Sequence, residues 1–99
     1  MQVYDIKMHT PLGDRYGQLR AQIQDGKLQG ELSLLEKTQP IDGTVREDGL
    51  WEFHGKLITL LSSIDYRATG RRVGDTLQLS LEGNRQTYAV TGTLREETE

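Results

Sequence analysis

The side chains in this sequence that could support acid–base chemistry are two histidines and an aspartate predicted to lie across from one of them. If residues 40–47 and 50–60 pair through a three-residue turn, Asp42 lies directly opposite His54. An Asp–His couple is half of a nucleophilic triad and needs a serine or threonine beside it. Thr44 is near in sequence but falls on the exposed sheet. We therefore interpret Asp42 and His54 as an exposed cross-strand pair and predict no catalytic residue.

Metal and cofactor chemistry also lacks suitable ligands. His9 and His54 lie on separate predicted strands without a third ligand, which makes a poor metal site. The chain contains no cysteine, so disulfides, thiolate zinc sites and cysteine nucleophiles are excluded. No segment has the pattern of a phosphate loop followed by a helix. We predict no metal and no cofactor, and we expect a binding or structural protein in preference to an enzyme.

The predicted interior is the other place for chemistry, and it is almost wholly apolar. Side chains alternate between the two faces of a strand, and this alternation, which we call strand parity, places few polar groups in the interior. They are the hydroxyl groups of the inward tyrosines, the indole of the one tryptophan and the side chain of Thr59. Sparse polar groups in an apolar cavity suit a small apolar or aromatic ligand. The predicted ligand-binding residues are Tyr4, Trp51, Tyr66 and Tyr88. The alternative is a lumen that these side chains fill completely.

A second apolar cluster is predicted where the first, third and fifth strands end. Its members are Leu12, Tyr16, Leu35, Ile58, Leu60 and Leu61. This rim has three interpretations: a portal for a ligand, a docking face for a protein partner or homodimer, and a plug that caps the core.

The elements that must position these residues are strands. Apolar and polar residues alternate with a period of two along the chain, and turn residues interrupt the alternation about every ten to twelve positions. The predicted strands are 3–10, 18–24, 27–35, 40–47, 50–60, 63–73, 76–82 and 86–95. The pattern predicts an all-β chain, an eight-stranded antiparallel up-and-down meander.

The predicted turns fall into two groups at opposite ends of the meander. Asp25-Gly26 has the composition of a two-residue type I′ turn, and Gly74-Asp75 that of a type II′ turn. Asp48-Gly49 fits a three-residue turn with a glycine bulge. The connections at the other end are expected to be mostly longer and looser; they are 10–17, 36–39, 61–62 and 83–85.

Glycines in the inward phase of the strands predict how the meander closes. They are Gly30, Gly43, Gly55, Gly70 and Gly92. Small inward positions let a sheet coil strongly, so we predict a small barrel with its last strand beside its first. A two-sheet β-sandwich is the runner-up. The pattern resembles the lipocalin and streptavidin class of barrels in architecture alone, without their signature motifs, and this resemblance implies a small ligand.

Length and charge bound the remaining possibilities. Ninety-nine residues support one core, so we expect a single domain over 1–99, with a frayed charged tail at 95–99. A net charge of −3 argues against a nucleic-acid partner. No apolar run is long enough for a membrane helix, and the N-terminus lacks a signal-peptide pattern. We expect a cytoplasmic protein that does not bind membranes.

Two functional hypotheses follow. The first is a small soluble barrel that binds a small apolar or aromatic ligand in its lumen. The second is a packed structural or protein-interaction module, a homodimer or an accessory domain, that uses the apolar rim.

Overall fold

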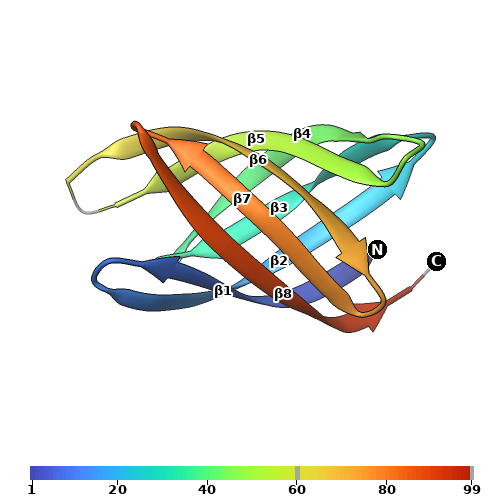
Figure 1. Cartoon of the computed structure of the whole chain (residues 1–99), viewed down its shortest axis with the longest axis horizontal. Coiled ribbons are helices and arrows are strands. Elements are labelled where there is room, and N and C mark those ends of the chain that lie inside the picture. Colours follow the sequence, from blue (N-terminus) through green and yellow to red (C-terminus); the bar gives the residue numbers. More distant parts are fainter. Residues whose placement is uncertain (60, 99) are drawn as a thin grey trace.

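A computed structural model describes residues 1–59 and 61–98, and this part of the chain forms eight β-strands. The strands are β1 (Gln2–Thr10), β2 (Gly13–Gln24), β3 (Lys27–Leu34), β4 (Lys37–Val45), β5 (Leu50–Ile58), β6 (Ser63–Val73), β7 (Thr76–Gly83) and β8 (Gln86–Glu97). Each strand pairs antiparallel with its neighbour in sequence, as Figure 1 shows. The all-β meander predicted from the alternation is confirmed.

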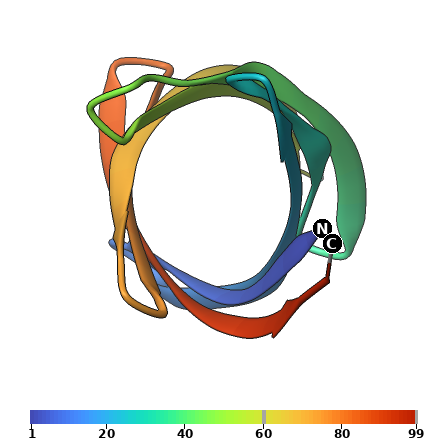
Figure 2. The ribbon, with the colours of Figure 1, turned by 90° about the vertical axis from the view of Figure 1, so that its right-hand side faces the viewer.

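The meander closes into a barrel because β8 pairs antiparallel with β1. The register between them places Met8 opposite Val90 and Ile6 opposite Gly92. Viewed along the barrel, the strands form a continuous ring (Figure 2). The barrel prediction and the architectural resemblance to lipocalins and streptavidin are therefore confirmed, and the sandwich alternative is wrong. The described residues include no helix that could span a membrane.

The three tight turns at one end have the predicted geometry. Gln24 pairs with Lys27 across Asp25 and Gly26, which both have positive φ as a type I′ turn requires. In the β4–β5 turn, the amide nitrogen of Arg46 donates to the carbonyl oxygen of Leu50 at 2.9 Å, and φ of Gly49 is 88°. Both chain termini lie at this end of the barrel (Figure 1).

Three of the four turns at the opposite end are shorter than the sequence predicts, whereas the β5–β6 connection is longer, since β5 ends at Ile58 and β6 begins at Ser63. β2 begins at Gly13, five residues before the predicted start, and Thr10 pairs with Gly13 across a two-residue turn. Two-residue turns also join β3 to β4 and β7 to β8. The expectation that these connections are mostly longer and looser is therefore wrong. For β1–β2 the reason is that the inward positions from Gly13 to Gly17 carry no apolar side chain, which conceals the alternation.

The core fills the barrel toward the end with the three tight turns. Tyr4 is fully buried and meets Trp51 edge to face, with ring centroids 5.9 Å apart. Phe53 and Tyr66 form a second edge-to-face pair at 6.3 Å. Phe53 pairs with Gly43 as predicted, so that the inward glycine lies beside an aromatic side chain.

Gly55 occupies an inward position because Tyr66 needs the space. The two residues pair across β5 and β6, and the tyrosine side chain lies over the glycine. A Cβ atom at Gly55 would lie 2.8 Å from the Tyr66 hydroxyl and 3.0 Å from the carbonyl oxygen of Pro40. An aromatic ring that covers a bare glycine is a recognised device in strongly curved sheets.

The C-terminal residues are more ordered than a frayed tail. β8 continues through Glu97, which pairs with Gln2. The Arg72 guanidinium of β6 donates two hydrogen bonds to the Glu97 carboxylate, at 3.1 and 3.3 Å, and a third to the carbonyl oxygen of Gly74 at 2.7 Å. Pairing with β1 and this bidentate contact hold residues 95–97 in the strand, whereas the sequence predicts fraying over 95–99.

The Arg72–Glu97 contact should make the barrel sensitive to acid. The hydrogen bond from Arg72 lowers the pKa of Glu97 below its ordinary value of 4.5. The stabilisation is therefore present above pH 4.5 and is lost as the pH falls through the lower folded-state pKa. Glu97→Gln should lower the melting temperature at neutral pH and flatten its decline between about pH 5 and 2. Melting curves recorded across this pH range test the prediction. Parallel declines of the melting temperature in the wild type and in Glu97→Gln would contradict it.

Candidate functional site

A large cavity opens at the end of the barrel where β1–β2, β3–β4, β5–β6 and β7–β8 turn. Its volume is about 1090 Å³. The lining residues are Met8, Thr10, Pro11, Leu12, Arg15, Tyr16, Leu35, Glu36, Lys37, Leu57, Ile58, Thr59, Leu61, Ile64, Gln86 and Tyr88. All these residues belong to the outer ends of the strands or to the turns that join them. We refer to this feature as the mouth cavity.

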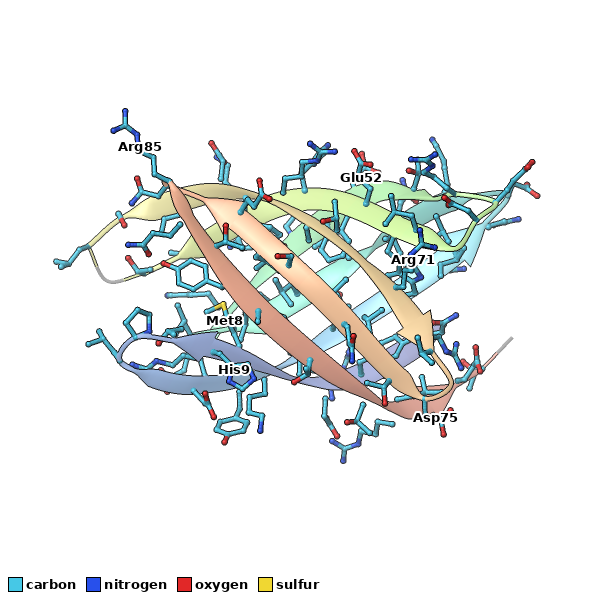
Figure 3. The ribbon with its side chains drawn as sticks, viewed as in Figure 1. Met8, His9, Glu52, Arg71, Asp75 and Arg85 are labelled. Atoms are coloured by element: carbon cyan, nitrogen blue, oxygen red, sulfur yellow. The ribbon has the colours of Figure 1, made fainter. Side chains whose placement is uncertain are left out.

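The walls of the mouth cavity are apolar because the inward phase of the strands is apolar. Met8 and Leu57 are buried, and Ile64 and Tyr88 are half-buried. Leu57 and Ile64 are register partners, so β5 and β6 supply adjacent wall residues. Figure 3 shows Met8 directed into the barrel, while His9, the next residue, is directed outward. The alternation of β1 thus separates the cavity wall from the polar surface.

The rim of the mouth cavity carries charged residues that strand parity did not predict. Arg15 is paired with Met8, so it shares the inward phase, and Lys37 is paired with the buried Leu34. Both residues line the cavity, as does Glu36. Arg15 and Lys37 fall in segments predicted as loops, 10–17 and 36–39, where strand parity does not apply. Arg15 lies two residues before Gly17, which is paired with the buried Ile6 and so also faces inward. That spacing is the sequence signal that could have identified Arg15 as an inward residue.

The structure brings most of the predicted rim residues together. Tyr16, Leu35 and Ile58 line the mouth cavity, together with the turn residues Leu12 and Leu61. The side chains of Leu12 and Leu61 are 85% and 97% exposed, so neither folds inward to cap the core. Leu60, also predicted for this rim, lies outside the described residues.

The predicted lumen residues are divided between the cavity and the core. Tyr88 lines the mouth cavity, and its hydroxyl donates to the side-chain oxygen of Gln86. Tyr4, Trp51 and Tyr66 are at most 4% exposed and do not line it. Packing explains the division, because the aromatic pairs fill the barrel on the side away from the mouth.

The hydroxyl of Tyr66 is the only buried side-chain polar atom without a hydrogen-bond partner among the described residues. Burial raises the pKa of Tyr66 well above its ordinary value of 10.0. A buried hydroxyl without a partner loses its hydrogen bonds to water and gains no hydrogen bond within the protein in return. The tyrosine therefore contributes packing against Phe53 and Gly55 while its polar tip costs stability.

Tyr66→Phe should stabilise the barrel by up to about 1–2 kcal/mol, because it removes an unpartnered polar atom and keeps the ring. The variant should also lose less stability above pH 10, where the unfolded tyrosine ionises and the buried one does not. Urea unfolding at pH 7 and pH 11 measures both effects. A variant less stable than the wild type at pH 7 would show that the hydroxyl has a partner in solution.

Both histidines lie on the exposed surface of the barrel, each next to an aspartate. Asp42 is opposite His54 as predicted. The histidine that makes a side-chain contact with a carboxylate is instead His9, whose Nδ1 lies 2.9 Å from Oδ1 of Asp14 on the exposed surface. Within residues 1–59 and 61–98, no cluster of three or more histidine, aspartate or glutamate side chains could hold a metal ion.

Fold and cavity define the chain as a small up-and-down β-barrel with an apolar cavity open at one end. No family model matches the sequence, and no curated protein matches it. Among solved structures, the fold is similar to that of mFAP1, a redesigned β-barrel bound to DFHBI. The TM-score is 0.68 at 16% sequence identity, over 95% of this chain and 92% of that one. At this identity the likeness shows a shared fold.

Proposed function

We propose that this barrel binds a small apolar or aromatic molecule in the mouth cavity. The observation that carries the proposal is a cavity of about 1090 Å³ with apolar walls, in a barrel whose remaining interior is packed. Ligand sites in proteins have volumes of roughly 300–1,000 Å³ and combine apolar walls with a few polar groups. The mouth cavity is slightly larger than the upper limit of that range and is lined in the same way.

The ligand would contact the inward side chains of β1, β5, β6 and β8. Met8, Leu57, Ile64 and Tyr88 supply apolar surface, and the Tyr88–Gln86 hydrogen bond lies at the edge. Tyr4, Trp51 and Tyr66 are buried and lie outside the cavity lining. The structure of mFAP1 with DFHBI indicates that a barrel of this architecture has room for a small molecule.

The second candidate function is association with another protein, or with a second copy of the chain, through the rim. The observation that favours it is the high exposure of Leu12 in the β1–β2 turn and of Leu61 in the β5–β6 turn, both at the mouth. Exposed apolar side chains that gather at one end of a molecule often mark an interaction surface. The two functions use the same end of the barrel, so the test must separate them.

The test is the binding of the neutral apolar dye Nile red, followed by its fluorescence and by displacement with decanol. Ile64→Arg places a charged side chain in the cavity wall and should weaken dye binding at least about tenfold. Val73→Arg is the matched control, because Val73 is an exposed valine outside the cavity lining. Equal dye binding by the two variants, or saturable binding by neither wild type nor control, would contradict the proposal.

A further inference from the structure

We propose that the ligand of the mouth cavity is an amphipathic anion, a carboxylate with an apolar tail, whose charged group binds between Arg15 and Lys37. This inference rests on the proposed function and specifies the chemical class of the ligand. It starts from the two cations that the strand register places at the inner rim.

Arg15 lies at the rim with its charged group free of carboxylate partners in the described part of the chain. It shares the inward phase of β2 with the apolar wall, because it is paired with Met8. Its Nη1 donates to the backbone carbonyl oxygen of Asp14 at 3.3 Å and lies 3.8 Å from the position of a Cβ atom at Gly13. The guanidinium is therefore turned toward the β1–β2 turn, and the apolar wall lies deeper.

Lys37 supplies the second cation from β4, which only β3 separates from β2 and Arg15. It is the first residue of β4 and is paired with Leu34, which is 3% exposed and belongs to the core. Lys37 itself is exposed, and within residues 1–59 and 61–98 its ammonium makes no ion pair. An inward-phase lysine at the end of a strand can lay its stem on apolar surface and keep its charge in water.

The charge of the cavity lining is opposite to that of the whole protein. Arg15, Lys37 and Glu36 are its charged residues, so the lining carries a formal charge of +1, whereas the chain carries −3. Glu36 belongs to the β3–β4 turn and opposes an anion. Cations at the rim above an apolar wall match a molecule with an anionic head and an apolar tail.

The experiment compares two probes with the same ten-carbon chain, decanoate and decanol, by calorimetric titration at pH 7.5 and low salt. The readout is the ratio of their affinities, because the shared tail cancels. The double variant Arg15→Gln, Lys37→Gln should lower the decanoate-to-decanol ratio about tenfold. Glu36→Gln should raise the ratio, and added salt should lower it in the wild type.

Arg85→Gln is the matched control. Arg85 lies in the β7–β8 turn at the same end, does not line the cavity, and is directed away from the barrel (Figure 3). Its affinity ratio should equal that of the wild type. An unchanged ratio in the double variant, with decanol still bound, would overturn the anion inference and leave the proposed function standing. Binding of neither probe by the wild type would contradict both.

Discussion

Gly30→Ala should destabilise the barrel strongly. Gly30 lies between β2 and β4, where the strongly coiled sheet brings the neighbouring backbone close. A Cβ atom there would lie 1.8 Å from the carbonyl oxygen of Arg20 and 3.1 Å from the Cα atom of Ala21. Backbone atoms of a paired strand cannot move aside without breaking the ladder. We expect a loss of more than about 4 kcal/mol, against a total stability of roughly 5–15 kcal/mol for a small domain.

Gly92→Ala is the matched control for this prediction. Gly92 is also a buried inward glycine, but the nearest atoms to its Cβ position are side-chain atoms, beginning with Cγ2 of Ile6 at 3.2 Å. A side chain can shift by a few tenths of an ångström, so the cost should be about 1–3 kcal/mol. Urea unfolding measures both variants, and equal stabilities would show that the close approach at Gly30 does not limit the fold.

Trp51→Ala should destabilise the barrel by about 3–5 kcal/mol. The indole is 3% exposed and packs edge to face on Tyr4, which is itself fully buried. Removing it leaves a void between β1 and β5 that rigid neighbouring strands cannot fill. The expected result is a folded protein with a markedly lower melting temperature.

Tyr16→Ala is the control for Trp51, because it also removes an aromatic ring from a strand. The Tyr16 side chain is 71% exposed, so its loss should change stability by no more than about 0.5 kcal/mol. If Trp51→Ala cost as little, the core would not be packed around the indole, and the interior would be open beyond the mouth.

The strand content, the tight turns and the barrel closure were predictable because they depend on local alternation and turn chemistry. Asp25-Gly26 determines the β2–β3 register, and the odd turn at Asp48-Gly49 places Gly43 opposite Phe53. An inward glycine in strand after strand is unfavourable in a flat sheet, so it correctly indicated strong coiling.

The location of the cavity was not predictable, because it depends on how far each aromatic side chain reaches along the lumen. Strand parity shows that Tyr4, Trp51, Tyr66 and Tyr88 point inward, but the structure packs the first three and leaves Tyr88 at the cavity wall. The inward charge of Arg15 was hidden because β2 begins with glycines and polar residues, which give no apolar alternation.

The most direct test of the ligand-binding account is an NMR titration of the isotopically labelled protein with decanol. If decanol binds in the mouth cavity, the methyl signals of Met8, Leu57 and Ile64 and the ring signals of Tyr88, which line the cavity, should show saturable shifts. The indole signal of Trp51, buried outside the cavity, should stay in place while the protein keeps its molecular mass in solution. Absence of shifts at the cavity wall, or shifts confined to Leu12 and Leu61 with a doubled mass, would contradict it and favour association through the rim.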